Sequence, residues 1–393
     1  MPAPFFPLDI VGLVVDALDN LCESFEERTF CGKAIALVCK SWTPLGLSLH
    51  WSHQAYVLDS DGGLLAKRVR DGRVQRYVKV LTIDDTLDDD GPGDGQPPPM
   101  EQVLRTTRRF ISKCTRLNRL HLVLLFPALP QVYGFLASIS TASLSSLFIG
   151  CRTFDYFSPA LFVRTLAGFP SLTFLDANLL VSEEHSSAYN KPEWNHRLRL
   201  TELNLFCQHF SDSPGPSNCL KAFSVTLDAT VLRTCTVQLS ADDAWFLPWL
   251  AACPSLHTLV LIAGSDSVVA ALLPPLTHHL PNFHALDDLQ FKRRRSGYLD
   301  ETASLPSPIP VDALLAAFPP TLRNAFISGV FFNWDASPHI VSLPCDDDNE
   351  YFKASRCTLF CLAQASYDPD VFKAGVYKIP TGADGKLEWR KVP

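Results

Sequence analysis

The sequence predicts a mixed α/β protein, in which a short N-terminal module of three helices precedes a stack of repeats whose strands form a parallel sheet. Three observations lead to this fold class. The chain has 393 residues, too many for one ordinary compact core. A six-residue leucine pattern returns along most of its length, and two apolar segments near the N-terminus have the spacing of short helices.

The composition is that of a folded chain with no electrostatic preference for polyanions. Hydrophobic residues make up 47% and charged residues 19% of the chain, which is not the composition of a disordered tail. The formal charge of −7 comes without a basic stripe, so we expect no nucleic acid as a main partner. One basic run, FKRRRS at 291–296, is either a solvated loop after a strand or a localisation or anion-contact signal.

The cysteines and the apolar runs predict a soluble intracellular protein, in the cytoplasm or the nucleus. The twelve cysteines are spread through apolar contexts without a CxxC pair, and no secretory signal opens the chain. Reduced, mostly buried thiols fit this pattern. The longest apolar run, 120–130, is interrupted by Pro127 and Pro130 and is too short to span a bilayer, so no membrane partner is expected.

The main organising signal is the pattern L-x-x-L-x-L. Copies begin at residues 117, 144, 172, 200, 232, 256, 286 and 322, and a weaker copy begins at 78. The intervals between them run from 24 to 39 residues, and three of the nine copies keep leucine at all three positions. This spacing indicates an irregular repeat of which each copy supplies one short strand.

The residues before each copy indicate where a helix ends and the strand begins. Similar punctuation recurs, as in KCTRL before 117, GFPSL before 172 and ACPSL before 256. Upstream, Ser158 and Pro159 are suited to the N-cap and the first position of a helix, and Ser240 is followed by acidic residues typical of a first turn. Pro248 should kink or divide the helix that Ser240 opens.

Such units cannot bury an apolar face alone, so they must stack. Over residues 70–335 the array resembles leucine-rich repeats of the irregular, long-unit kind, although an ordinary α/β domain with apolar strands remains the alternative. The resemblance implies a solenoid with a concave face that binds macromolecules. One residue of each strand, between the second and third apolar positions, should point outward. These residues form a row: His121, Phe148, Asp176, Asn204, Thr236, Val260, Gln290 and Phe326. Their mixed chemistry suits a protein or peptide partner, and the alternative is that the row is simply a solvated face of the sheet.

No catalytic, metal or cofactor site is expected. Reading the acidic run 84–95 as a calcium loop puts Thr86 and Pro97 at ligand positions. The adjacent His278 and His279 diverge on either a strand or a helix, and the pair Cys357 and Cys361 lacks further ligands for zinc. The common nucleophile, phosphate-loop and zinc motifs do not occur in the sequence, so a hydrolase would need a convergent triad that the sequence does not display.

The first apolar segment, 5–18, is too apolar for a helix that packs on one core. At about 100° per residue, its apolar positions cover an arc of about 200°, roughly twice the width that one core requires. The second segment, 34–42, is expected to form another short apolar helix that carries Cys39 and Trp42 and stops or kinks at Pro44. Together the two segments are too small to support themselves, so we expect a partner chain.

The order Phe6-Pro7-x-Asp9-Ile10, followed by Leu37-Val38-Cys39-Lys40-Ser41-Trp42, resembles an F-box. The usual motif opens with Leu-Pro-x-Glu and closes with Leu-x-x-Val-Cys-Arg-x-Trp, so this chain departs at Phe6 and Asp9, and its linker from 19 to 36 is somewhat longer. In that family the motif docks on the Skp-type adaptor of a cullin-RING ubiquitin ligase. The resemblance implies the following adaptor-contact residues, some of which only hold the small domain together: Phe6, Pro7, Leu8, Ile10, Val14, Leu18, Leu37, Val38, Cys39 and Trp42.

The combination resembles the F-box and leucine-rich-repeat proteins, particularly divergent fungal ones. It implies a non-enzymatic substrate receptor: residues 1–55 recruit the ligase, residues 70–335 bind an unknown protein substrate, and residues 336–393 form a terminal cap. Within the cap, 375–392 reads as two strands around a Gly-rich turn. The alternative is a repeat scaffold that is not coupled to a ligase.

Overall fold

The structure is a computed structural model of the whole chain. It describes residues 8–22, 24–57, 67, 74–84, 100–125, 129–139, 143–153, 158–181, 197–209, 217–293, 317–322, 324–328, 358–362, 376–378 and 390–392. The acidic segment 85–95, Cys357 and the end of the basic run, 294–296, therefore lie outside the described residues. Two compact units make up the chain, one before and one after residue 190, except that Gln208–Phe210 group with the first.

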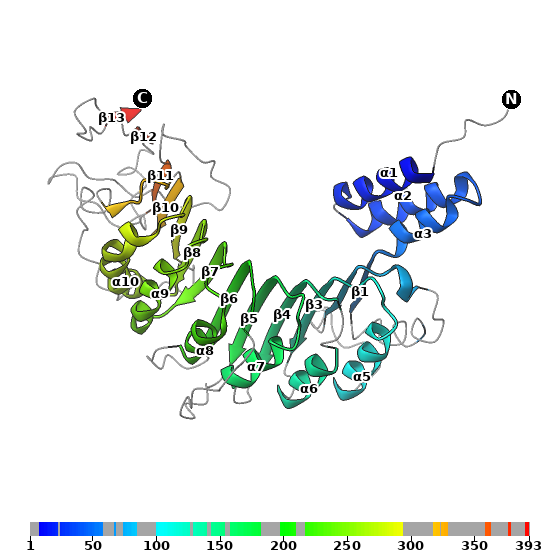
Figure 1. The fold of residues 1–393 in the computed structure, drawn as a ribbon, viewed down its shortest axis with the longest axis horizontal. Helices are drawn as coiled ribbons and strands as arrows, with labels where there is room; N and C mark the ends of the chain where they lie inside the picture. Colours follow the sequence, from blue (N-terminus) through cyan, green and yellow to red (C-terminus); the bar gives the residue numbers. More distant parts are fainter. Residues whose placement is uncertain are drawn as a thin grey trace, which may run out of the picture. The chain divides into compact units, whose positions relative to one another are not determined.

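Three helices open the first unit: α1 (Leu8–Leu21), α2 (Phe25–Val38) and α3 (Thr43–Trp51) (Figure 1). Ser24 caps α2 in a capping box with Glu27: the Ser24 hydroxyl accepts from the Glu27 backbone N–H, and the Glu27 carboxylate accepts from the Ser24 backbone N–H. The helix expected over 34–42 has other bounds: residues 34–38 are the end of α2, and residues 39–42 are not helical. The chain leaves α2 at Cys39 in an extended conformation, and Pro44 starts α3 instead of stopping a helix, because its fixed φ suits the first turn.

Two glycines let α2 and α3 approach closely. A Cβ built on Gly32 would lie 2.7 Å from the Gly46 carbonyl oxygen and 2.7 Å from the His50 nitrogen. A Cβ on Gly46 would meet the backbone of Ala36 and of Gly32. Neither contact is possible for a real side chain, so this helix pair requires glycine on both sides.

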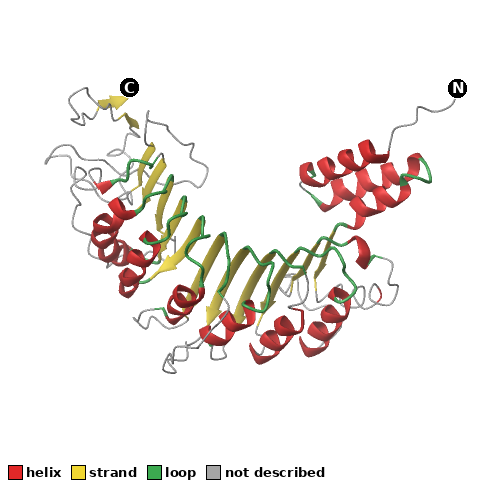
Figure 2. Ribbon diagram, in the orientation of Figure 1, coloured by secondary structure: helices red, strands yellow, loops and turns green. Residues whose placement is uncertain are grey.

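A parallel sheet follows in the first unit, with the strands in chain order. The strands are β1 (His53–Val57), β2 (Val80–Asp84), β3 (Arg119–Leu125), β4 (Ser146–Thr153) and β5 (Phe174–Val181). The connections carry η1 (Gln75–Tyr77), α5 (Met100–Ile111), α6 (Leu129–Ile139) and α7 (Pro159–Leu166). Figure 2 shows α5, α6 and α7 along one face of these strands.

The second unit repeats this arrangement. Its parallel strands, again in chain order, are β6 (Glu202–His209), β7 (Thr234–Leu239), β8 (Thr258–Ala263), β9 (Asp288–Arg293), β10 (Asn324–Ser328) and β11 (Thr358–Leu362). Its helical elements are α8 (Asn218–Thr226), η2 (Ala241–Trp245), α9 (Phe246–Ala251), α10 (Asp266–His279) and η3 (Leu280–Asn282). An antiparallel pair, β12 (Val376–Lys378) and β13 (Arg390–Val392), matches the two strands predicted at 375–392.

Each leucine-pattern copy supplies one strand, which begins at the third residue of the copy. The first position is buried in all nine copies, from Val78 to Leu322. The fourth position is fully buried wherever its side chain is described, as at Leu120, Leu203 and Leu259. Alternate strand residues thus enter the core under the helices, and the residues between them lie on the opposite face.

The backbone joins successive copies in the same way at six junctions of the described chain. The carbonyl of the second residue of a copy accepts hydrogen bonds from two consecutive backbone N–H groups of the next copy. Lys79 accepts from residues 118 and 119 at 3.0 and 3.1 Å, and His257 accepts from residues 287 and 288 at 2.8 and 3.0 Å. The copies are therefore structurally equivalent where the strands begin.

Two predicted helix starts are confirmed. Ser158 caps α7, with its hydroxyl accepting from the Leu161 N–H, and Pro159 is the first helical residue. The segment opened by Ser240 divides, as Pro248 suggested, into a 3-10 turn and the short helix α9. In the part of the chain that the structure describes, no helix is both long and apolar enough to cross a membrane.

Candidate protein-binding surfaces

Helix α1 has two adjacent apolar faces. Val11 and Val15 are buried and form the small core with Leu49. Ile10, Leu13 and Val14 lie exposed beside them, and Leu13 is 71% exposed. At about 100° per residue the exposed apolar arc continues directly from the buried one. The surplus apolar width predicted for this segment is thus present, and it faces solvent.

Helix α2 adds exposed apolar side chains of its own. Phe30 and Leu37, which are 75% and 85% exposed, lie two turns apart on one stripe of the helix, and Val38 follows at its end. Cys39 is exposed after them, and the Ser41 hydroxyl 3.0 Å from its Sγ lowers the pKa of the thiol. Large apolar side chains at such exposure mark a surface that can be covered by another chain.

The predicted adaptor residues divide between this surface and the core. Ile10, Val14, Leu37, Val38 and Cys39 are exposed. Leu18 and Trp42 are partly buried and pack on the small core of the module, so their contacts hold the three helices together. Phe6 and Pro7 lie outside the described residues, as does the side chain of Leu8 at the start of α1.

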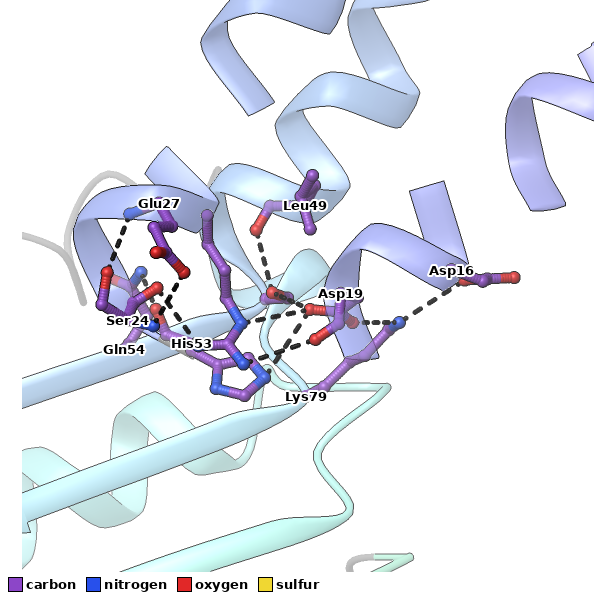
Figure 3. Close-up of polar contacts among 10 residues, drawn as sticks. Asp16, Asp19, Ser24, Glu27, Leu49, His53, Gln54 and Lys79 are labelled. Atoms are coloured by element: carbon purple, nitrogen blue, oxygen red, sulfur yellow. Dashed lines mark hydrogen bonds and ion pairs between the residues drawn. The ribbon is translucent and has the colours of Figure 1, made fainter. Parts of the chain in front are cut away.

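A cluster of charges joins the helical module to the first strands (Figure 3). The Asp19 carboxylate on α1 is only 10% exposed and accepts hydrogen bonds from the Lys79 ammonium at 2.8 Å and the Ser52 hydroxyl at 2.9 Å. The Arg28 guanidinium pairs with the same carboxylate at 3.6 Å and donates to the Asp19 carbonyl at 3.3 Å. Helices α1 and α2 are thereby connected to the residues that open β1 and β2.

His53, at the start of β1, lies in the same cluster. Its Nε2 is 3.7 Å from the Asp19 carboxylate. Burial, reinforced by the Arg28 charge, nevertheless lowers the pKa of His53 to about 4. The imidazole is therefore uncharged at neutral pH, and this contact is not an ion pair there.

The sequence does not reveal this cluster. Asp19 occurs in the polar part of the α1 pattern, and its partners Ser52 and Lys79 are 33 and 60 residues away. No local spacing connects positions so far apart, and only the fold brings them together. The capping box of Ser24 and Glu27, by contrast, has a recognisable sequence spacing.

The predicted outward-facing residues occupy one register position in each unit. In the first unit, His121 pairs with Phe148 and Phe148 with Asp176. In the second unit the row continues through neighbouring strands as Asn204, Thr236, Val260, Gln290 and Phe326. Each described side chain of the row is partly exposed, while that of Phe326 is not described. In each unit, these residues lie on the face of the sheet opposite the helices.

An aromatic group stands out in the first unit. The rings of His121 and Phe148 stack with centroids 3.9 Å apart and planes at 17°, and Phe148 contacts the tilted ring of Phe174 at 4.7 Å. Burial, with Arg119 nearby, lowers the pKa of His121 to about 4, so this row carries no histidine charge at neutral pH. Phe174 was not among the predicted site residues, because it is the first strand residue of its copy.

The comparisons with known proteins define no family. No protein-family model matches the chain, and no curated protein matches it in sequence. The F-box and leucine-rich-repeat resemblances therefore depend on the motif residues themselves.

Proposed function

We propose that the chain is the substrate receptor of a cullin-RING ubiquitin ligase, with the N-terminal helices as an F-box that docks on a Skp-type adaptor and the strands as a leucine-rich-repeat solenoid that binds a protein substrate. The main observation in support of adaptor docking is that α1 has two apolar faces, one buried in the module and one exposed. Val11 and Val15 face the core of the module, while Leu13, with Phe30 and Leu37 of α2, remains exposed.

Burial of such a surface favours association. A fully buried leucine or phenylalanine side chain contributes about 1.5 to 3 kcal/mol relative to an exposed one, so a few of them can sustain a stable complex even after the cost of association. The motif residue Leu37 belongs to the exposed stripe of α2, and Val38 and Cys39 follow it at the end of the helix. This arrangement supports a protein partner more than a small ligand.

Co-purification with a Skp-type adaptor tests the proposal. Leu13→Lys places a charge in the proposed contact, where desolvation should reduce adaptor recovery at least tenfold. Gln102→Lys puts the same charge on an exposed polar position of α5, outside the helical module, and should leave recovery unchanged. If Leu13→Lys and Gln102→Lys recover adaptor equally, the α1 surface is not the docking site.

A repeat scaffold without a ligase is the second candidate. The charge cluster around Asp19 supports the scaffold, because it attaches the helices to the residues that open the first strands, as expected for a module that caps the end of a repeat array. Absence of both adaptor and cullin from complexes purified with the full chain would favour the scaffold.

A further inference from the structure

Helix α5 and the turn after it carry a local excess of positive charge, although the chain as a whole has a formal charge of −7. The excess comes from a basic surface of exposed residues: Arg105, Arg108, Arg109, Lys113 and Arg116. Between residues 100 and 118 the sequence holds one carboxylate, that of Glu101. The overall composition, which predicts no basic stripe, therefore conceals this surface.

The amphipathic pattern of α5 brings its three arginines together. The opposite side of the helix is buried in the first unit: Val103, Leu104, Thr107, Phe110 and Ile111. At about 100° per residue, Arg105, Arg108 and Arg109 fall within an arc of about 100° that faces away from these buried residues. Residues three or four apart on a helix have Cβ atoms about 5 to 6 Å apart, so the three guanidinium groups can contact one ligand.

Most of this charge has no counterion in the described chain. Arg105 pairs with Glu101 at 2.6 Å, and both side chains are more than 60% exposed. Among the described residues, Arg108, Arg109 and Arg116 take part in no ion pair. The neighbouring helix α6, which packs beside α5 in Figure 1, has no charged residue. Cations at a helix C-terminus stabilise the helix itself, but Arg116 lies beyond α5, so this role does not account for the whole surface.

The chemistry of the surface favours a short acidic peptide over other anions. A long polyanion would extend past these cations and meet a chain that is negative overall, which opposes its binding. A membrane-surface helix needs exposed large apolar side chains, and none of those on the described chain belongs to α5. Four of the five cations are arginines, whose planar guanidinium binds a carboxylate through two parallel hydrogen bonds.

The spacing of the arginines fits an extended peptide. Arg105 and Arg109 are four residues apart on α5, which is about 6 Å along the helix axis. Alternate side chains of an extended chain lie about 6.7 Å apart on the same side. A segment with an acidic residue at every second position can therefore follow α5 with its carboxylates near successive cations.

We propose that this basic surface binds an extended acidic segment of a partner protein, with Arg108 and Arg109 as the principal contacts. The inference goes beyond the proposed function, because the surface belongs neither to the exposed apolar side chains of α1 and α2 nor to the open face of the sheet. It stands or falls independently of the adaptor.

Fluorescence anisotropy with the full chain tests the inference. The probe is the labelled peptide Gly-Glu-Gly-Glu-Gly-Glu-Gly-Glu-Gly, and its matched control carries glutamine in place of glutamate. At low salt we expect the glutamate peptide to bind about tenfold more tightly than the glutamine peptide. Raising the salt concentration from about 50 to 300 mM should remove most of this preference, because exposed charges are screened.

Two double variants assign the binding to this surface. Arg108→Gln with Arg109→Gln should weaken binding of the glutamate peptide about fivefold to tenfold. Arg164→Gln with Arg233→Gln removes the same charge from exposed positions outside the surface and should weaken it less than about twofold. Arg108→Lys with Arg109→Lys keeps the charge without the planar fork and should weaken binding about threefold. The thermal midpoint of each variant verifies folding.

Four results would overturn the inference. They are equal affinities for the glutamate and glutamine peptides, equal losses in the two glutamine double variants, and tighter binding of a short DNA duplex than of the peptide through Arg108 and Arg109. The fourth concerns Asp88, Asp89 and Asp90, sequence neighbours of α5 outside the described residues. If replacing these three with asparagine raises peptide affinity more than about tenfold, the acidic run of the chain itself occupies the surface, and an external partner is excluded.

Discussion

Replacing Asp19 with alanine should weaken the connection between the helical module and the first strands more than any neighbouring change. The substitution removes the acceptor of hydrogen bonds from Lys79 at 2.8 Å and from Ser52 at 2.9 Å. It also leaves the Arg28 side chain, only 13% exposed, without its carboxylate partner. Breaking a buried pair by removing one member costs about 3 to 5 kcal/mol, and partial access of water to Lys79 lowers the expected loss to about 2 to 3 kcal/mol.

The chain offers a matched control for this experiment. Asp16 lies on the same helix and approaches the same Lys79 ammonium at 3.8 Å, but its side chain is 72% exposed. Asp16→Ala should therefore cost less than about 0.5 kcal/mol. Chemical denaturation gives the free energies of unfolding, and hydrogen exchange over 8–22 and 43–52 shows whether the loss is confined to the helices.

A double-mutant cycle isolates the pair. Lys79→Met combined with Asp19→Ala should be less destabilising than the sum of the two single changes, with a coupling energy of about 1 to 2 kcal/mol. Additive free energies, or an Asp19→Ala protein as stable as Asp16→Ala, would refute the view that this cluster holds the module to the strands.

Three other changes test separate parts of the structure. Gly46→Ala should destabilise the α2 and α3 pair by at least about 2 kcal/mol, because the added methyl group meets backbone atoms. Gly134→Ala, with nothing near its Cβ, should instead stabilise α6 by about 0.5 kcal/mol. Equal shifts of the melting temperature in the two variants would contradict the close crossing of α2 and α3. Trp42→Ala should lower the free energy of unfolding by about 2 kcal/mol, less than the loss of a fully buried tryptophan, because the ring is only partly buried. If limited proteolysis cuts the module of this variant as it cuts the unchanged chain, the ring is not part of the core. His53 and His121 have pKa values of about 4 in the folded chain, below the usual value near 6.5. Between pH 6.5 and pH 4 the unfolded chain therefore binds more protons at these residues than the folded chain does. The free energy of unfolding should fall as the pH decreases through this range. Because both rings are partly exposed, the loss between pH 7 and pH 5 should be about 1 kcal/mol for each; a protein with His53→Gln and His121→Gln should lose that part of the pH dependence, and an unchanged slope would contradict the assignment.

The strands could be predicted because the leucine pattern reports burial directly. A strand with one face in a core needs apolar residues at alternate positions, and the first leucine of each copy marks the turn that precedes it, so positions such as Leu117 and Leu256 locate β3 and β8. Two strands without the pattern, β1 and β11, were missed, whereas β12 and β13 were predicted from their Gly-rich turn. β1 lies at the end of the predicted module, and β11 lies in the predicted cap, where its sequence TLFCL offers an apolar run without the preceding leucine.

The helices were harder to predict because local signals for proline and glycine depend on tertiary context. Pro44 can end a helix or begin one, and only the extended backbone at Cys39 decides between these. Pro274 and Pro275 lie inside α10, where packing outweighs the loss of backbone hydrogen bonds. Of the candidate surfaces, the excess apolar arc of α1 followed from helical geometry, whereas the Asp19 cluster and the contact of Phe174 with Phe148 depend on strand register, which the sequence does not encode locally.

Calorimetric titration of the full chain with a Skp-type adaptor tests the central claim most directly. Docking of the exposed apolar side chains of α1 and α2 should give tight binding with a negative heat-capacity change and little dependence on salt, and Leu13→Lys should abolish it. Absence of binding, or binding that Leu13→Lys leaves unchanged, would contradict the assignment of this chain as a ligase substrate receptor.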